Sequence, residues 1–519
     1  MTTRRQDASL ASGLRQEAPS PTNTRWVILA LLALAGLTLL AYFQPLPVLL
    51  LVVGVVVVAL SWARPFWVFA GLLALLPFHE QMLRVVTWQL GWTGVRVTAL
   101  SLWKEAVIGL LLVVLIVQHV IGKRRIQAKL YQFDLWLLAL VLFSGIYVAV
   151  AATPSIGLFG FRNYFEPLAV FFLARLLPYS RQELKRLLIV LCVIAAGVAA
   201  FGIYQALAID FPTMIRMGYV DDFGNLPFAF KTALADGQPR PRAISTVTGP
   251  NQLAMVLNLF ILLAGYAVLW LDRSPGSSKT ERRGLWRIAL VGLIALYSVC
   301  LLLTYSRGGL LALAVSLMAA VGIAVYERGI KRTWRELASN RWLVIGLASV
   351  LILAAVGLAA SGFALRIWRG LSGADPAALG HVSSMDYAAS FIASNPLGIG
   401  MGMGGPRALR FLGNANIQHT ESTYLQFGME AGLLGMVLLL IMLLSLLATL
   451  WRMRRRQQQR GDLPAQLLTE VAFVTWAGAL AVFIVTPLIQ NFLVASYLWL
   501  IAGLAFHLDA TNGQPRHDR

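Results

Sequence analysis

Three arginine residues are the first candidates for chemistry, because each lies where an apolar segment meets a polar one. Arg307 lies in the sequence TYSRGG, Arg242 lies in RPRA, and Arg162 lies in FRNYFEP. A guanidinium group keeps its charge and matches phosphate oxygens bidentately, and an arginine at membrane depth faces a cavity or a partner. These residues therefore form a candidate phosphate-binding set. For Arg162, an ion pair with Glu166 one helical turn away is an equal alternative.

A second polar segment offers groups that accept a proton. The sequence HTESTYL places His419 and Glu421 shortly before a long apolar run. An imidazole or a carboxylate can act as general base on a hydroxyl. We expect Ser306 and Tyr424 to lie in the same site as substrate-binding residues. No set of His, Asp and Glu has the spacing of metal ligands, so the sequence predicts neither a metal nor a cofactor.

The composition indicates what kind of scaffold holds these residues. Hydrophobic residues make up 58% of the 519 residues, charged residues make up 13%, and the mean hydropathy is +0.72. Soluble domains have about 45–50% apolar and about 25% charged residues. The composition therefore excludes a soluble globular enzyme, a disordered chain and a secreted disulfide scaffold. It predicts an all-α, polytopic membrane helix bundle.

Apolar runs predict about fourteen transmembrane helices, because one span needs about 20 mostly apolar residues. The runs lie near residues 26–43, 46–61, 66–78, 105–121, 133–151, 163–177, 187–206, 250–271, 288–304, 308–326, 342–361, 431–450, 467–486 and 489–506.

The basic residues predict the orientation of these spans. The net charge is +20, and the clusters Lys123-Arg124-Arg125, Arg282-Arg283 and Arg454-Arg455-Arg456 belong in the cytoplasm under the positive-inside rule. Both termini are then cytoplasmic, and the candidate site residues lie on the outer face. Basic charge at the membrane also attracts anionic lipid, whereas no nucleic-acid-reading motif accompanies it. The predicted partner is therefore the bilayer, and not a nucleic acid.

Polar stretches divide the chain into four predicted parts. These are a disordered cytoplasmic tail at 1–24, N-terminal transmembrane helices at 25–160, a core at 161–450, and a C-terminal transmembrane pair with a cytoplasmic tail at 451–519. The core includes the outer loops 207–249 and 362–430, which show scattered charges rather than the pattern of a packed domain. Within the second loop, residues 381–394 predict a short amphipathic helix that ends at Asn395-Pro396.

Several of these segments together resemble the O-antigen ligase/polymerase family of bacterial membrane glycosyltransferases. The matching features are RNYFEPL from Arg162, GPNQLA from Gly249 after Arg242, TYSRGG from Thr304, and NPLGIG from Asn395 with the later YL and EAGLLG. The resemblance covers roughly residues 160–450. Their order and their placement around the largest outer loop carry the resemblance, since each motif alone is weak.

The resemblance implies a metal-independent transfer at the outer face of the bacterial cytoplasmic membrane. The donor would be a glycan on undecaprenyl diphosphate, and the acceptor would be a hydroxyl of a glycan, a lipid or a protein. Arg307 and Arg242 would hold the donor diphosphate, with Arg162 as a third ligand. The family often shows a histidine at the register that Glu421 occupies here, while His419 lies two residues earlier. Either residue is therefore a candidate base.

Two other classes of function compete with this hypothesis. A transporter or flippase of lipid-linked glycans would also use many spans, but the sequence shows no matching halves with charges at the membrane midplane. A metal-dependent glycosyltransferase would need an acidic cluster in the first outer loop, where most of the loop separates Glu80 from Glu105. The acidic pair Asp221-Asp222 is interpreted as a solvated loop tip.

Overall fold

The computed structural model describes residues 45–123, 129–221, 224–233, 239–273, 280–332, 376–405 and 420–511. Contacts divide the chain into two units, Met1–Val68 and Phe69–Arg519. The described part of the first unit consists mainly of helix α2 (Pro45–Ala63). Every described candidate site residue belongs to the second unit.

The second unit is built almost entirely from helices. It begins within α3 (Pro65–Leu75), and its further elements are η1 (Leu76–Phe78), α4 (His79–Arg84), the π-helical turn η2 (Val85–Gln89), α5 (Val95–Ser101), α6 (Trp103–Val120), α7 (Gln132–Val150), α8 (Pro154–Phe165), α9 (Leu168–Leu176), α10 (Arg181–Ala208), α11 (Phe211–Arg216), η3 (Phe228–Phe230), β1 (Lys231–Ala233), β2 (Pro239–Pro241), α12 (Pro250–Arg273), α13 (Thr280–Leu303), α14 (Arg307–Arg328), α18 (Pro376–Ser394), α20 (Thr423–Gln459), α21 (Leu463–Val482), η4 (Leu488–Gln490) and α22 (Phe492–Thr511).

The predicted class, an all-α polytopic membrane protein, is confirmed. Within the described residues, ten helical stretches are long and apolar enough to cross a membrane: Pro65–Gln89 and nine that lie in α6, α7, α10, α12, α13, α14, α20, α21 and α22. Each of the ten overlaps a predicted span. The predicted span 46–61 corresponds to the shorter apolar helix Leu51–Ala63. The predicted spans 26–43 and 342–361 lie outside the described residues.

The predicted span 163–177 does not form one continuous helix. The chain divides there into α8 and α9, which have 12 and 9 residues and are each too short to cross a bilayer. Pro167 lies at the break, and a proline cannot donate the hydrogen bond that a continuous helix requires at this position. Apolar composition alone suggested one helix, but the proline separates it into two.

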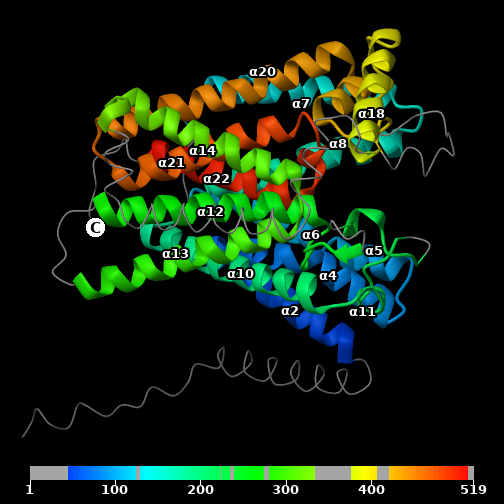
Figure 1. Ribbon diagram of the computed structural model, residues 1–519, viewed down its shortest axis with the longest axis horizontal. Coiled ribbons are helices and arrows are strands. Elements are labelled where there is room, and N and C mark those ends of the chain that lie inside the picture. The colour runs from blue at the N-terminus through cyan, green and yellow to red at the C-terminus, as the bar shows by residue number, and fades with distance from the viewer. Residues whose placement is uncertain are drawn as a thin grey trace, which may run out of the picture. The chain divides into compact units, whose positions relative to one another are not determined.

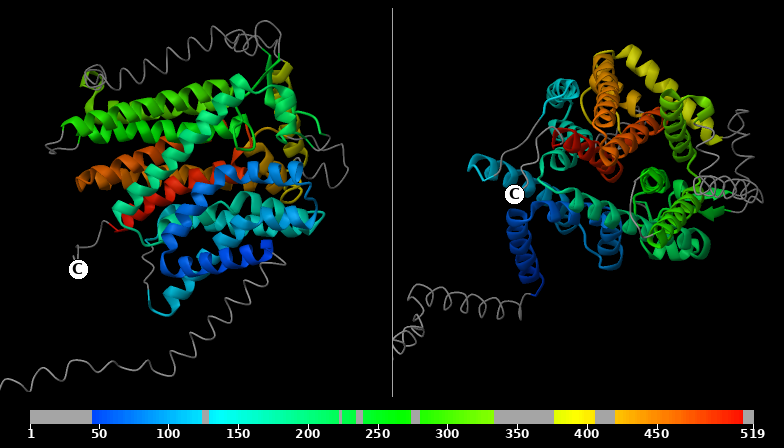
Figure 2. Two further views of the ribbon diagram at one scale, coloured as in Figure 1. Left: turned by 90° about the horizontal axis from the view of Figure 1, so that it is seen from below. Right: turned by 90° about the vertical axis from the view of Figure 1, so that its left-hand side faces the viewer.

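Three helices form the centre of the second unit. In α12, α21 and α22, 78%, 78% and 94% of the membrane-length window is buried, compared with 22% in α7. Figures 1 and 2 show these helices running lengthwise among α14, α20 and α13, and the contacts of α21 with α12, α14, α20 and α22 agree with that arrangement.

Successive membrane-length helices run in opposite directions, so their termini gather at two opposite ends of the second unit. The site end is where α12, α14 and α20 begin, at Pro250, Arg307 and Thr423. The far end is where the same helices finish. An ion pair between Arg454 of α20 and Glu327 of α14 (2.5 Å) shows that two of these finishing ends lie together.

The segment 207–249, which was predicted to be an outer loop, is more ordered than its sequence predicted. Its scattered charges suggested no packed structure, yet buried side chains from this segment pack into a cluster: Ile209, Met214, Tyr219, Leu226 and Ile244, with Phe211, Ile215, Met217 and Phe230 against them. The apolar residues are spaced too irregularly to show a helical or strand period. Only the fold brings them onto one small core, which supports the hairpin of β1 and β2.

The predicted helix at 381–394 is confirmed as the end of α18. This helix packs on the start of α20 through Ala388, Ile392 and Met429, and Figure 1 shows the two side by side. Helix α20 begins at Thr423, which is earlier than the predicted span at 431. Gly432 interrupts it with φ 72° and ψ 178°, so a short first segment precedes the long membrane helix.

Candidate functional site

Arg307 is the first residue of α14, and polar groups hold the turn before it. The Oγ of Ser306 accepts a hydrogen bond from Gly309 N (3.0 Å) and donates one to Asn251 Oδ1 (2.8 Å). Ser306 is therefore the N-cap of the helix, where serine is strongly preferred. The first turn of a helix favours anions because its N–H groups and dipole are positive. Arg307 adds a full positive charge at this position.

Arg242 contacts the same turn. Its Nε donates to Thr304 O (2.7 Å), its Nη1 donates to Ala229 O (2.9 Å), and its Nη2 lies 3.4 Å from Asn251 Oδ1. The residue follows β2, and its own N–H donates to Phe230 O (3.0 Å). The hairpin and the turn therefore fix the Arg242 guanidinium from both sides.

Asn251 joins the two arginine segments. Its Oδ1 accepts hydrogen bonds from both Ser306 and Arg242. Nearby, the buried Asn258 donates from Nδ2 to Gly309 O (2.7 Å). A Cβ on Gly309 would come within 2.4 Å of Ala254 Cβ, so the glycine permits the close approach of α14 to α12.

Backbone strain marks both arginine segments. Within the described residues, the non-glycine residues with positive φ are Ser245 (57°) and Tyr305 (49°). Such a conformation costs about 1–3 kcal/mol, and residues in it cluster at functional sites. Ser245 follows Arg242 by three residues, and Tyr305 precedes Arg307 by two. The strained residues therefore lie where the sequence predicted chemistry.

A buried glutamine stabilises the strained Ser245. The Oε1 of Gln205 accepts hydrogen bonds from Ile244 N (3.0 Å) and Ser245 N (2.7 Å). The hydroxyl of Tyr219 donates to Ser245 O (2.6 Å), and burial raises the pKa of Tyr219, which keeps that hydroxyl protonated. Gln205 of α10 and Tyr219 of the buried cluster in segment 207–249 thus hold the residues that follow Arg242.

Arg162 lies in a network of ion pairs between α6 and α8. Its Nε contacts Glu166 Oε2 (2.9 Å), and its Nη2 contacts Glu105 Oε1. Lys104 contacts Glu105 (2.5 Å) and Glu166 (3.3 Å), and its ammonium lies 4.2 Å from the ring of Phe492. The ion pair with Glu166 is therefore present, and two carboxylates balance the two cations.

The described part of the HTESTYL segment forms the start of α20. Ser422 is the N-cap, and its Oγ accepts from Leu425 N at 3.4 Å. Tyr424 donates from its hydroxyl to Leu480 O (2.9 Å) and is half-buried. Glu421 is also half-buried and directly precedes the cap. His419 lies outside the described residues.

The segment between α21 and η4 links this start of α20 to the turn Thr304–Arg307, which we call the arginine turn. Thr423 Oγ1 donates to Thr486 O (3.0 Å), and Thr423 N donates to Phe483 O (2.9 Å). A Cβ on Gly308 would lie 3.7 Å from Thr486 Oγ1. The structure therefore links Arg242 to the turn before Arg307 through Asn251 and Thr304 O. Glu421 and Tyr424 lie on the neighbouring segment of the site end.

A glycine-rich turn, residues 398–405, folds over a buried carboxylate. The Oε2 of Glu430 accepts from Gly402 N (2.9 Å), and its Oε1 accepts from Gln426 Nε2 (3.1 Å). Gly400 N and Ile399 N also donate to main-chain oxygens of α20. The motifs NPLGIG and EAGLLG, which are separate in the sequence, therefore form one structural feature.

Sequence reasoning missed several of these supporting residues. Gln205 lies in a segment that was interpreted only as a membrane helix, and Lys104 directly precedes another such segment. Gln205 contacts Ser245 and Lys104 contacts Glu166, and both partners are distant in the chain. Glu430 was quoted as part of a motif without a role. The one available signal was a polar residue within an apolar run, which usually pairs inside the bundle.

No three His, Cys, Asp or Glu side chains are grouped so as to hold a metal ion in the part of the chain that the structure describes. Residues 291–440 match the model of the O-antigen ligase family. That region includes the arginine turn, α14, α18, the glycine-rich turn and the start of α20. The match confirms the family predicted from the motifs.

The chain therefore combines several membrane-length helices with a match to a family of membrane glycan ligases and polymerases. The matched family implies lipid-linked glycan substrates and suggests a multi-pass bacterial membrane protein. No curated protein matches the chain.

Proposed function

We propose that this protein is a glycosyltransferase that moves or polymerises a glycan from an undecaprenyl-diphosphate donor to a hydroxyl acceptor at the outer face of the cytoplasmic membrane, without a metal. The observation that supports the proposal is the contact of Arg242 with Thr304 O, in the turn that directly precedes Arg307 at the start of α14. Contacts with Asn251 support it, since the two segments share that side chain.

The leaving diphosphate gathers negative charge as the glycosidic bond to phosphate breaks. Preorganised positive groups stabilise such charge more effectively than mobile ones, because they need no reorganisation during the reaction. Arg307 at the helix start is the proposed principal ligand of the diphosphate. Arg242 adds a second positive charge, and its contacts with Thr304 O and Ala229 O fix that charge beside the turn.

The acceptor hydroxyl needs a base. Glu421 or His419 is proposed to take the proton while the acceptor oxygen bonds to the anomeric carbon and the carrier diphosphate leaves with the electron pair of the broken C–O bond. The position of Glu421 beside the N-cap of α20 supports its assignment. Tyr424 is proposed to line the acceptor side of the site, and Arg162 to hold α6 and α8 beside it.

The decisive experiment substitutes Arg307→Ala and measures glycan transfer in membranes that contain a lipid-linked donor. Loss of one preorganised group that stabilises the leaving charge should lower the rate about 10²–10³-fold. Arg307→Lys should recover part of the rate, because a lysine keeps the charge but not the bidentate fork. The matched control is Arg96→Ala, which removes an exposed arginine of α5.

Wild-type activity of Arg307→Ala at normal expression would contradict the proposal. The transporter alternative makes a different prediction in sealed vesicles, where the carrier lipid would change leaflet without any new glycosidic bond. A fully active preparation in the presence of a chelator would support metal independence, and loss of activity that added metal restores would contradict it.

A further inference from the structure

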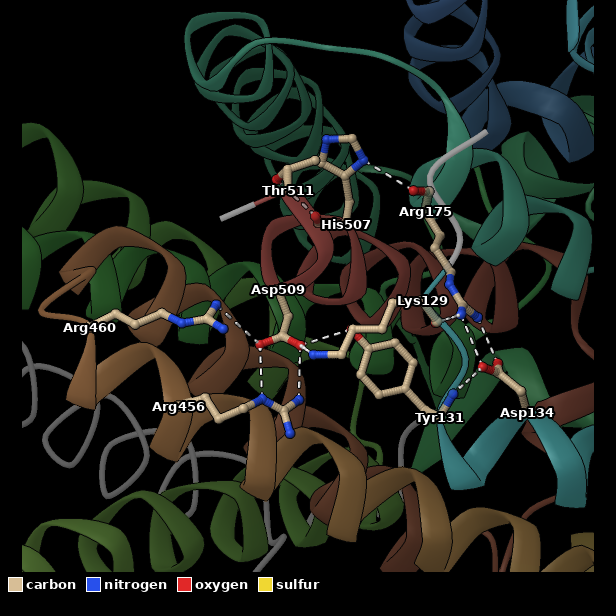
Figure 3. Close-up of polar contacts among 9 residues, drawn as sticks. All are labelled: Lys129, Tyr131, Asp134, Arg175, Arg456, Arg460, His507, Asp509 and Thr511. Carbon is tan, nitrogen blue, oxygen red and sulfur yellow. Dashed lines mark hydrogen bonds and ion pairs between the residues drawn. The ribbon is translucent and has the colours of Figure 1, made fainter. Parts of the chain in front are cut away.

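A group of cations at the far end surrounds a single buried carboxylate. Asp509 of α22 has no exposed side-chain surface. Its Oδ2 accepts from Arg456 Nη2 (2.8 Å), Lys129 Nζ (3.1 Å) and the Tyr131 hydroxyl (2.8 Å), and Arg460 Nη1 lies 3.9 Å from Oδ1. Figure 3 shows the three basic side chains approaching Asp509 from α20 and from the segment before α7.

The charges in this group do not balance. Lys129, Arg456 and Arg460 bring three positive charges to one negative charge, and they pair with no other carboxylate among the described residues. Beside them, Arg175 and Asp134 form a closed bidentate pair (2.6 and 2.9 Å) that contributes no net charge. A formal excess of two positive charges therefore remains.

The same three cations are the accessible part of the group. The exposed fractions of their side chains are 45% for Lys129, 34% for Arg456 and 37% for Arg460, whereas Asp509 is fully enclosed. The carboxylate therefore lies beneath the cations and holds them together. Burial and the contact with Asp509 raise the pKa of Tyr131, so its hydroxyl remains a donor to the carboxylate and does not add a negative charge.

The cations and Asp509 lie at the ends of membrane-length helices, and this position indicates which anion they can reach. Asp509 lies in the last turn of α22, Arg456 and Arg460 lie at the end of α20, and Lys129 lies just before α7 begins. One terminus of each of three candidate spans, α7, α20 and α22, thus lies at this group. The ends of spans lie at the level of lipid headgroups, where basic pockets between helices bind anionic lipid.

We propose that Lys129, Arg456 and Arg460 form a binding site for the phosphate of an anionic lipid headgroup, with Asp509 as the residue that positions them. Arginine forks and a lysine ammonium suit the oxygens of a phosphodiester. This site lies at the opposite end of the helices from Arg242 and Arg307, and it is independent of the proposed function.

The test measures the melting temperature of the purified full-length chain in nanodiscs. Lipid that binds the folded state stabilises it by mass action. Nanodiscs that contain phosphatidylglycerol should raise the melting temperature above that in phosphatidylcholine alone. The double substitution Lys129→Gln with Arg460→Gln should remove more than half of this increase. The matched control is Arg186→Gln with Lys331→Gln, two exposed basic residues at the same far end, which should keep it.

The competing explanation is an ion network that serves only the fold. It predicts that Lys129→Gln with Arg460→Gln lowers the melting temperature equally in both lipids, and that result would overturn the proposal. Arg460→Gln alone gives a milder second variant, since its guanidinium is the one farthest from Asp509. Inorganic phosphate added to phosphatidylcholine nanodiscs should not reproduce the increase; an equal increase would assign the site to soluble phosphate instead.

Discussion

At the scale of single residues, Asn251 connects the proposed catalytic groups. Its Oδ1 accepts from the Ser306 cap and lies near the Arg242 guanidinium, while Ser306 directly precedes Arg307. If Asn251 only stabilised the fold, any side chain of the same shape with an acceptor oxygen could replace it. A side chain beside a diphosphate would not tolerate an added negative charge, because two like charges a few ångströms apart repel by several kcal/mol near a protein surface.

The substitution Asn251→Asp separates these two roles. It keeps the Oδ1 acceptor, so the purified variant should melt close to the wild type. Its charge opposes the anionic donor, and we expect KM for the lipid-linked donor to rise at least about tenfold, which corresponds to about 1.4 kcal/mol. The measurement is the donor dependence of glycan transfer in detergent or membranes.

Asn225→Asp is the control for this substitution, since it adds the same charge at an exposed loop position. An unchanged KM in both variants would mean that the donor phosphates bind elsewhere than at the turn held by Asn251.

At the scale of elements, the glycine-rich turn and the first segment of α20 act as one unit. Gly398, Gly400 and Gly402 all have positive φ. Their surroundings also leave no space for a Cβ. A Cβ on Gly400 would meet Ala151 Cα at 2.3 Å, and a Cβ on Gly402 would meet Ile156 O at 2.5 Å. The turn therefore packs against backbone that has no flexible side chain to move aside.

Gly402→Ala should displace this turn. Steric overlap in a packed interior costs about 1–3 kcal/mol, and the left-handed backbone adds about 1–2 kcal/mol for a residue with a Cβ. We expect a lower melting temperature of the purified protein and reduced transfer activity, because Glu430 loses its contact with Gly402 N.

Gly109→Ala in α6 provides the comparison, since no atom lies within 4 Å of a Cβ built there. It should leave the melting temperature unchanged or raise it, because alanine favours a helix over glycine. Equal stability of the two variants would show that the turn tolerates a Cβ and is not fixed as described.

At the scale of the whole chain, the distribution of charge predicts which end of the helices faces the cytoplasm. The far end carries the ends of α14 and α20, with Arg328, Arg455 and Arg456 among their last residues. The positive-inside rule places such ends in the cytoplasm. The rule then predicts that the arginine turn at the opposite end faces outward, on the side of the proposed glycan transfer.

Labelling of single cysteines in intact cells tests this orientation. In a background with Cys192→Ser and Cys300→Ser, Asn225→Cys should react with a membrane-impermeant maleimide from outside. Lys331→Cys, which is exposed at the far end, should react only after the membrane is permeabilised. The reverse pattern would place the arginine turn in the cytoplasm and would contradict the proposed outer-face reaction.

The sequence by itself determined the class of the protein and the identity of its motifs. Apolar runs of membrane length and a low content of charge are properties of local composition, so they predicted the helices without any knowledge of contacts. The ordered motifs around Arg162, Arg242 and Arg307 predicted the family in the same way, and the match of residues 291–440 confirms it.

Only the tertiary structure decided which groups meet. It placed Asn251 and Thr304 at Arg242, paired Arg162 with Glu105 and Glu166, and folded the glycine-rich turn over Glu430. Except for the pairs Arg162–Glu166 and Arg242–Asn251, these contacts join residues that are well apart in the sequence. Hydrophobic periodicity describes one helix at a time, whereas a hydrogen bond between two helices depends on their packing, their register and the breaks at Pro167 and Gly432.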